Sequence, residues 1–141
     1  MNKLILVFAC LVLAIPCQAQ IINVDDDGPA DFKIIQAAID QCIDGDTVLL
    51  YPGTYYENLS VKGKSITLTS IDPADPNVAT ATIIDGNSLG TVVSIIDVNV
   101  ADVNMVLAGL TITNGLAAVG GGIYCEDSNL TLFHCVDFRT F

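Results

Sequence analysis

The amino-acid sequence predicts an all-β protein, a right-handed parallel β-helix (a solenoid) with one capping α-helix at its N-terminal end. Three observations support this fold class. One amphipathic segment, residues 31–42, precedes the strands. From residue 47 onward the chain offers only short apolar strands and turns. A similar triplet recurs at a spacing of about 20 residues or twice that, as in solenoids: Ile66-Thr67-Leu68, Leu110-Thr111-Ile112 and Leu130-Thr131-Leu132.

Residues 1–19 have the composition of a secretory signal peptide. Lys3 supplies a short positive start, residues 4–15 are an unbroken apolar run, and Ala19 suits the cleavage position. The run is shorter than the roughly 20 apolar residues that a membrane span needs. We therefore expect no transmembrane helix in the mature chain, residues 20–141, and we expect the protein to be secreted or held at the cell surface.

The mature chain is strongly acidic. Once Lys3 is removed, 4 basic residues face 16 acidic ones, which gives a net charge of −12 (4 − 16). Such a surface repels nucleic acid and anionic lipid headgroups, so neither is expected as a partner. The acidic residues are scattered rather than grouped, which favours a solvated surface over a dedicated ion site.

The N-terminal part of the mature chain predicts a strand, a turn and a helix. Residues 21–24 are a short β-type run, and Asp25-Asp26-Asp27-Gly28-Pro29 turns the chain. Asp31 is the expected N-cap of the helix and Gly45 its C′ glycine. A helix in this place can cover the open end of a strand stack. No second helix is expected, so a βαβ fold is unfavourable.

Short strands and turns fill the rest of the chain. A β-sandwich would also use short strands, but it requires hairpins, and tight Asn-Gly connections are few here. Residues 72–77 read as a loop, and Gly120-Gly121-Gly122 reads as a set of sharp corners rather than a phosphate loop. The expected strands are residues 47–51, 55–61, 65–70, 81–85, 91–98, a pair within 105–113, 123–125, 130–132 and 136–138.

Two blocks resemble known β-helical proteins. The segments Asp31-Phe32-Lys33-Ile34-Ile35-Gln36-Ala37-Ala38-Ile39 and Gly53-Thr54-Tyr55-Tyr56-Glu57 are similar to the opening of pectin methylesterases, members of the pectin-lyase-like superfamily. The segment Gly120-Gly121-Gly122-Ile123 is similar to the repeats of exported bacterial proteins such as polymorphic outer-membrane proteins, although Phe141 stands where their motif has Asn. The resemblance implies a right-handed β-helix whose catalytic groups, in the enzymes, lie on later coils. We therefore assign no catalytic residue.

The C-terminal end has no evident cap. A solenoid needs one at each end, because an open last coil exposes unpaired backbone groups. The sequence stops at Phe138-Arg139-Thr140-Phe141 within the strand pattern. This predicts that the chain is a truncated piece of a longer protein.

The candidate ligand-binding residues are tyrosines. Tyr55, Tyr56 and Tyr124, with Tyr51 beside them, could form a strip on which sugar rings stack, although tyrosines more often pack in cores and corners. The turn Asp25-Asp26-Asp27-Gly28 is acidic enough to attract Ca²⁺ but lacks the ligand spacing and distal Glu of an EF-hand. We expect no cofactor and no metal site.

Three cysteines remain in the mature chain: Cys42, Cys125 and Cys135. The number is odd, so they do not form a closed disulfide framework. Cys125 and Cys135 could pair after export or could be small buried hydrophobes. His134 beside Cys135 is not expected to form a dyad, since neighbours on a strand point to opposite faces.

Two functions remain open. The first is an exported structural or binding module that contacts an acidic or neutral polysaccharide. The second is the N-terminal fragment of a polysaccharide lyase, pectin esterase or glycoside hydrolase. Paired carboxylates on one groove would favour the enzyme, but the acidic residues occur mainly at turns. The sequence therefore favours the binding module, without a complete catalytic site.

Overall fold

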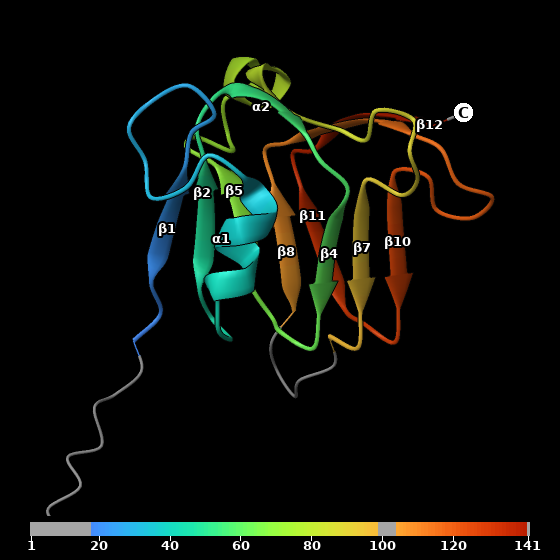
Figure 1. The fold of residues 1–141 in the computed structure, drawn as a ribbon, viewed down its shortest axis with the longest axis horizontal. Helices are drawn as coiled ribbons and strands as arrows, with labels where there is room; N and C mark the ends of the chain where they lie inside the picture. The colour runs from blue at the N-terminus through green and yellow to red at the C-terminus, as the bar shows by residue number, and fades with distance from the viewer. Residues whose placement is uncertain (1–17, 99–103, 141) are drawn as a thin grey trace, which may run out of the picture.

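A computed structural model describes residues 18–98 and 104–140, with the backbone alone for residues 137–140. Most of the predicted signal peptide, residues 1–17, lies outside the described residues. Short strands dominate the described chain, together with two short helices (Figure 1). The elements are β1 (Ile21–Val24), α1 (Ile35–Gln41), β2 (Thr47–Leu50), β3 (Gly53–Tyr56), β4 (Leu59–Lys62), β5 (Thr67–Ser70), α2 (Pro76–Ala81), β6 (Thr82–Asp85), β7 (Val93–Ile96), β8 (Met105–Ala108), β9 (Thr111–Gly115), β10 (Ile123–Glu126), β11 (Leu130–Phe133) and β12 (Val136–Thr140).

The strands form three sheets, and neighbouring strands within each sheet are parallel. Sheet A has the order β1-β2-β5-β8-β11, sheet B the order β3-β6-β9-β12 and sheet C the order β4-β7-β10. From β2 onward the chain visits sheets A, B and C in turn and then returns to A. We call each such passage a rung. The rungs follow one another from left to right in Figure 1.

The length of a rung varies, but the register of the stacked strands is regular. Thr47 pairs with Thr67, 20 positions later, and Thr67 pairs with Val106, 39 positions later. This agrees with the expected spacing of about 20 residues or twice that. Of the three recurring triplets, those of β5 and β11 lie in sheet A, whereas that of β9 lies in sheet B. The third triplet is therefore not the same structural element.

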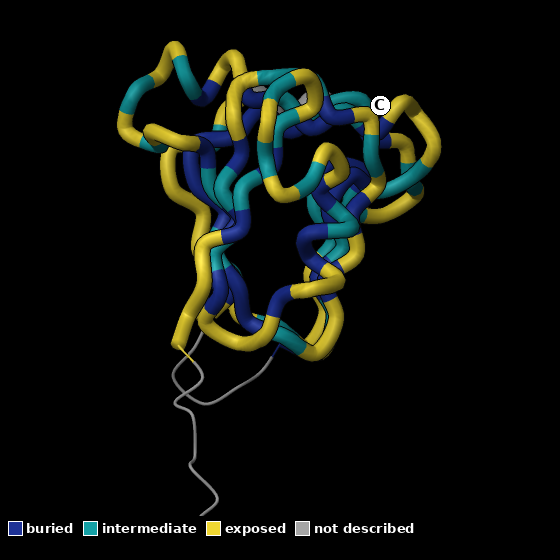
Figure 2. The backbone as a smooth tube through the Cα atoms, turned by 60° about the vertical axis from the view of Figure 1, so that its left-hand side comes forward, coloured by how far each residue is buried: buried dark blue, intermediate teal, exposed yellow. Residues whose placement is uncertain are grey.

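The core lies between the three sheets. Alternate residues of each strand point inward, as period-two side-chain placement requires, and they stack on the matching residues of the next rung. In sheet A, Leu68 lies on Leu107, and both are 0% exposed. Figure 2 shows this buried interior enclosed by exposed corners. Each such leucine contributes roughly 2 kcal/mol through burial.

Helix α1 differs from its predicted limits. It begins at Ile35, and its N-cap residue, Ile34, has a side chain that makes no capping hydrogen bond. Asp31 lies outside the helix, and its carboxylate accepts a hydrogen bond from the Asn23 backbone N–H instead. Gly45 adopts a positive φ of 90°, but it lies in the turn after the helix rather than at C′.

The free backbone N–H and C=O groups at the two ends of α1 form hydrogen bonds with side chains that are distant in the sequence. The two Glu57 carboxylate oxygens accept hydrogen bonds from the Ile35 and Gln36 backbone N–H groups at 2.7 and 2.9 Å. Lys64 Nζ donates to carbonyl oxygens near the other end, at 2.9 Å from Ile39 and 3.0 Å from Cys42. Charges of these signs suit the helix ends on which they lie. Contacts of α1 with β1, β2 and β4 place it across the first rung.

A second helix, α2, was not expected from the sequence. It occupies Pro76–Ala81, between β5 and β6, and leads directly into β6. The Asp75 side chain accepts a hydrogen bond from the Asn77 backbone N–H at 2.8 Å, and Pro76 occupies the first turn. These are standard helix-start features. The helix is short and packs against β6 and β9, so it covers part of sheet B without changing the parallel arrangement.

One predicted strand is in fact two. Residues 55–61 divide into β3 and β4 at a corner formed by Glu57 and Asn58, and the two strands belong to different sheets. The expected pair within residues 105–113 is confirmed as β8 and β9. Corner glycines are also confirmed: a Cβ at Gly115 would collide with the Gly121 carbonyl oxygen, so this position admits only glycine.

Candidate functional site

The N-terminal loop folds back along the outer edge of β1. The backbone N–H groups of Asp25 and Phe32 donate to the carbonyl oxygens of Phe32 and Asn23 at 3.0 and 3.1 Å. The Asp31 carboxylate accepts from the Asn23 backbone N–H at 2.9 Å and from its side-chain amide at 3.2 Å. These hydrogen bonds, the backbone one above all, lower the pKa of Asp31 below its ordinary value. The carboxylate therefore stays ionised.

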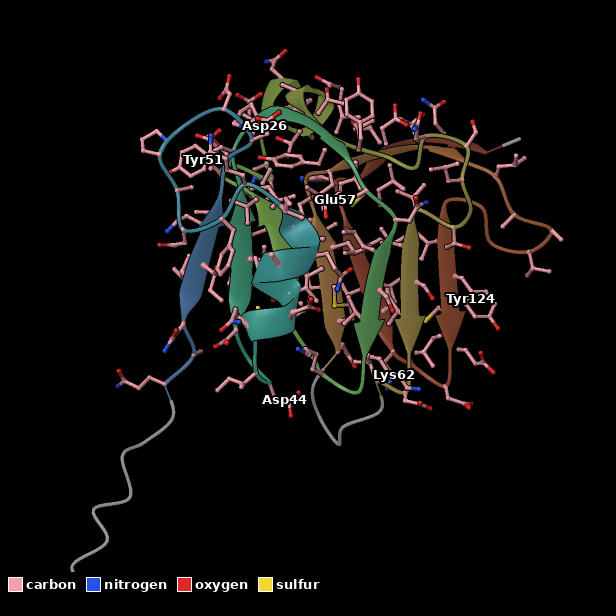
Figure 3. The ribbon with its side chains drawn as sticks, in the orientation of Figure 1. Asp26, Asp44, Tyr51, Glu57, Lys62 and Tyr124 are labelled. Carbon is pink, nitrogen blue, oxygen red and sulfur yellow. The ribbon has the colours of Figure 1, made fainter. Side chains whose placement is uncertain are left out.

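A pocket of about 360 Å³ opens beside this carboxylate. Tyr51, which directly follows β2, forms one wall with its partly exposed side chain. Figure 3 shows Tyr51 beside the end of β1, with Asp26 of the acidic turn nearby. The pocket combines an aromatic ring, a carboxylate and a carboxamide. It is lined by Asn23, Pro29, Ala30, Asp31 and Tyr51.

A second pocket, of about 340 Å³, shares Asp31 with the first as a lining residue. Polar groups dominate it as well, although the exposed side chain of Ile21 and the partly buried ring of Phe32 contribute to it. Both pockets involve the edge strand β1, since Asn23 lines the first and Ile21 and Ile22 line the second. The lining residues of the second pocket are Gln20, Ile21, Ile22, Asp31, Phe32 and Gln41.

The acidic turn brings three carboxylates together. Asp25, Asp26 and Asp27 have oxygens within 4.8 Å of one another, the one group of metal-ligand type found in the described part of the chain. The Asp25 carboxylate also accepts a hydrogen bond from the Gly28 backbone N–H at 3.1 Å. It accepts a longer one from the Asp27 backbone N–H, two residues on, at 3.4 Å, which is typical of an Asx turn. The expectation that no metal binds here stays a prediction.

The three candidate tyrosines do not form a strip. Tyr55 is buried, and its hydroxyl lies 2.8 Å from the Tyr51 carbonyl oxygen and 3.2 Å from that of Val24. Burial, and then the neighbouring aspartates, raise the pKa of Tyr55. Tyr55 therefore offers a ligand neither an exposed ring face nor a charged hydroxyl group. Tyr56 is 69% exposed on sheet B. Tyr124 lies on sheet C, and its hydroxyl donates to Glu126 at 2.9 Å, which raises the pKa of Tyr124.

His134 and Cys135 lie in the corner between β11 and β12, not on a strand. His134 has a positive φ of 49°, so strand alternation does not separate the two residues, and they line one pocket of about 220 Å³. Burial nevertheless raises the pKa of the Cys135 thiol, and a protonated thiol is a poor nucleophile. The pair therefore does not make an activated dyad. The other lining residues are Ala74, Pro76, Ala79 and Val136.

The three cysteines of the predicted mature chain, Cys42, Cys125 and Cys135, are free thiols in the structure. Cys42, the C-cap residue of α1, is buried, and Cys135 is partly buried. Cys125 is exposed, although the register places it above Ile95 on the inward face of sheet C. Cys125 and Cys135 are therefore not paired. For Cys125, the expected inward position on its strand is correct, but the expected burial is not.

The sequence reasoning missed Asn23 and Asp31 as site residues and weighted Tyr51 below the other tyrosines. The sequence does contain a signal for the first two of these residues. Asn23 and Asp31 flank the acidic Gly-Pro turn, and such a turn can return the chain to the strand it has just left. The placement of Tyr51 beside them depends on the parallel pairing of β1 with β2, which no local pattern encodes.

No protein-family model matches this chain, and no curated protein matches it. Where the structure describes the chain, it has no helix with the length and apolar character for a membrane crossing. The pectin-lyase-like resemblance accordingly depends on the quoted motifs alone, and the function must be argued from the pockets.

Proposed function

We propose that this chain is an exported binding module, built as a right-handed parallel β-helix, that contacts polysaccharide through the pocket at Tyr51. The fold proposal is supported by the three parallel sheets and by the repeated A-B-C order of the strands. A right-handed path is the general rule for connections between parallel strands. Export is supported by the composition of residues 1–19.

One observation carries the ligand class: a partly exposed tyrosine ring and an ionised carboxylate border the same pocket. Sugar rings present apolar C–H faces that pack on aromatic rings and hydroxyl groups that donate to carboxylates. Asn23 adds a carboxamide, which both donates and accepts hydrogen bonds. A pocket of this composition suits a pyranose ring.

The charge of the site favours a neutral polysaccharide over an acidic one. Asp31 borders the pocket, three further aspartates lie in the adjoining turn, and the predicted mature chain carries a net charge of −12 (4 − 16). Bringing a polyuronate to this surface would place like charges together. A neutral β-linked glucan or xylan meets no such penalty.

Calorimetric titration of the purified protein with cellohexaose, xylohexaose and hexagalacturonate tests this proposal. We expect one of the neutral oligosaccharides to bind with a Kd of about 0.1–1 mM, as for a single shallow subsite. Tyr51→Ala should weaken that binding about five-fold or more. Tyr56→Ala is the matched control, since Tyr56 is exposed on a different sheet, and it should leave the affinity unchanged.

Three results would count against the proposal. Absence of binding by both neutral hexamers would remove the ligand class. An equal effect of Tyr51→Ala and Tyr56→Ala would remove the site. Release of methanol or unsaturated products from pectin, with or without Ca²⁺, would show an enzyme instead of a binding module.

A further inference from the structure

A buried carboxylate lies beside the point where the chain enters β1. The backbone N–H of Gln20, directly before β1, donates to Asp46 Oδ1 at 2.8 Å. The other carboxylate oxygen of Asp46 accepts from the Ile43 backbone N–H at 2.9 Å. Asp46 directly precedes β2 and is only 2% exposed. The carboxylate is therefore a fixed part of the interior that contacts the chain at Gln20.

Neither of these hydrogen bonds brings a positive charge to the Asp46 carboxylate, because both donors are neutral backbone groups. Lys64 is near, since its charge and that of Asp46 both act on the Cys42 thiol. Its Nζ, however, donates to the carbonyl oxygens of Ile39 and Cys42, and among the described residues no hydrogen bond joins it to Asp46. Burying a carboxylate costs free energy that a cation in contact with it offsets. A positive charge on the Gln20 nitrogen would provide that cation.

The position of Gln20 is fixed from both sides of the residue. Its N–H contacts Asp46, and its carbonyl oxygen accepts from the Thr47 backbone N–H at 2.8 Å, which joins it to the start of β2. Gln18 and Ala19, just before it, are exposed and belong to no strand or helix. The bond between Ala19 and Gln20, where cleavage of the signal peptide is expected, thus separates exposed chain from the first strand.

We propose that Asp46 is the binding site for the N-terminus that this cleavage creates, the α-ammonium group of Gln20. The proposal rests on the proposed export of the chain and not on binding at Tyr51. Hydrolysis breaks the Ala19–Gln20 peptide bond: the water oxygen joins the Ala19 carbonyl carbon, which becomes a carboxylate, and both water protons go to the Gln20 nitrogen. At neutral pH that nitrogen is an ammonium group. A charged donor thereby replaces the amide N–H at the atom that already contacts Asp46.

The new charge strengthens the first rung. A hydrogen bond between an ionised donor and an ionised acceptor is roughly twice as strong as a neutral one, and this one is shielded from water on the Asp46 side. An uncleaved chain has only the neutral contact. The mature chain is therefore more stable than its precursor, although the two share every residue of the strand stack.

The same contact protects the new N-terminus from cyclisation. A glutamine at an N-terminus can close on itself: its α-amine attacks the side-chain carbonyl carbon, a C–N bond forms, and the side-chain nitrogen takes a proton from the α-nitrogen and leaves as ammonia. This attack needs the lone pair of an unprotonated amine. On Asp46, the α-nitrogen of Gln20 is held in its protonated form, so the glutamine stays open while the protein is folded.

Chains with defined N-termini test the ion pair. Three chains, released from a fusion protein by a site-specific protease, begin at Gln20, Ala19 and Gln18 and all end at residue 141. They carry the same charges, but only the first places its ammonium group on Asp46. We expect its Tm to be about 5 °C or more above the others. The chain from Gln18 is the matched control, and its Tm should equal that of the chain from Ala19.

Asp46→Asn should remove the Tm difference between the chains from Gln20 and Ala19, because the carboxamide carries no charge. A readout without any substitution covers the case in which this variant does not fold. Mass spectrometry follows the loss of ammonia from the wild-type chain that begins at Gln20. We expect this loss to be about ten-fold or more slower in buffer than in denaturing urea.

Four results would overturn the proposal. They are an equal Tm for the three chains, a Tm difference that persists in Asp46→Asn, equal rates of ammonia loss in buffer and in urea, and a first residue other than Gln20 in the protein that the full chain exports with its own signal peptide. Titration with oligosaccharides enters none of these tests. A failure of the Tyr51 site is therefore distinguishable from a failure of the Asp46 site.

Discussion

The two ends of the strand stack meet water in different ways. At the N-terminal end, α1 lies across the first rung, and Asp31 and Phe32 form hydrogen bonds along the outer edge of β1. The Gln36 side chain covers the edge of β4: its oxygen accepts from the Ser60 backbone N–H at 2.8 Å, and its NH₂ group donates to the Ser60 carbonyl oxygen at 3.1 Å. At the C-terminal end, inward side chains such as Leu132 are exposed. One strand pattern thus gives a core position or an exposed one, depending on what lies above it.

Cysteine reactivity should show this contrast most strongly. Burial, and then the nearby Asp46 carboxylate, raise the pKa of Cys42 to about 11, so at pH 8 its thiolate fraction is about a hundredth of that of an ordinary thiol. In dilute protein the exposed thiol of Cys125 should therefore react with N-ethylmaleimide many times faster than the buried thiol of Cys42. Mass spectrometry of the labelled peptides measures the ratio, and equal rates would contradict the contrast.

Truncation of equivalent leucines gives the next largest effect. Leu107→Ala should lower the free energy of unfolding by about 3 kcal/mol, because it leaves a cavity in a closed core. Leu132→Ala should lower it by less than about 1 kcal/mol in dilute protein, because part of that side chain is already in water. Urea denaturation compares the two. A loss of similar size for both would show that the last rung is as well covered as the third.

Glu57→Gln examines how α1 is held to the first rung. A carboxamide offers one acceptor oxygen where the carboxylate offers two, so one of the Ile35 and Gln36 backbone N–H groups would lose its partner. We expect a loss of about 1–2 kcal/mol in urea denaturation. Glu126→Gln, on the exposed surface of sheet C, is the matched control and should change the stability by less than about 0.5 kcal/mol.

Lys64→Met should have the smallest effect. It removes the cation that donates to the Ile39 and Cys42 carbonyl oxygens, and we expect a loss of about 1 kcal/mol. Lys62→Met is the control, since Lys62 is exposed at the end of β4. If both variants unfold at the same urea concentration as the wild type, the lysine contacts do not stabilise α1.

Much of the fold could be predicted because it depends on local patterns. Alternating side chains in β5, corner glycines at residues 120–122 and the amphipathic helix are visible in short windows of the sequence. The errors occur where a remote group replaces a local one. Asp31 is a suitable N-cap by position, yet the helix starts later, because Glu57 satisfies its first N–H groups from the corner after β3.

The candidate site was less predictable than the fold. Tyr55 and Tyr56 are neighbours in the sequence, but one faces the core and the other faces water, and a tyrosine pattern alone does not say which. Tyr51 and Asp31 are twenty residues apart and meet because β1 pairs with β2. The sequence by itself determined the short strands, their corners and the acidic surface, since each follows from side-chain periodicity and composition. Only the tertiary structure decided which side chains cap the first rung, which line the Tyr51 pocket and which inward-facing residues of β10 and β11 are left exposed, because burial depends on the neighbouring rung rather than on the neighbouring residue.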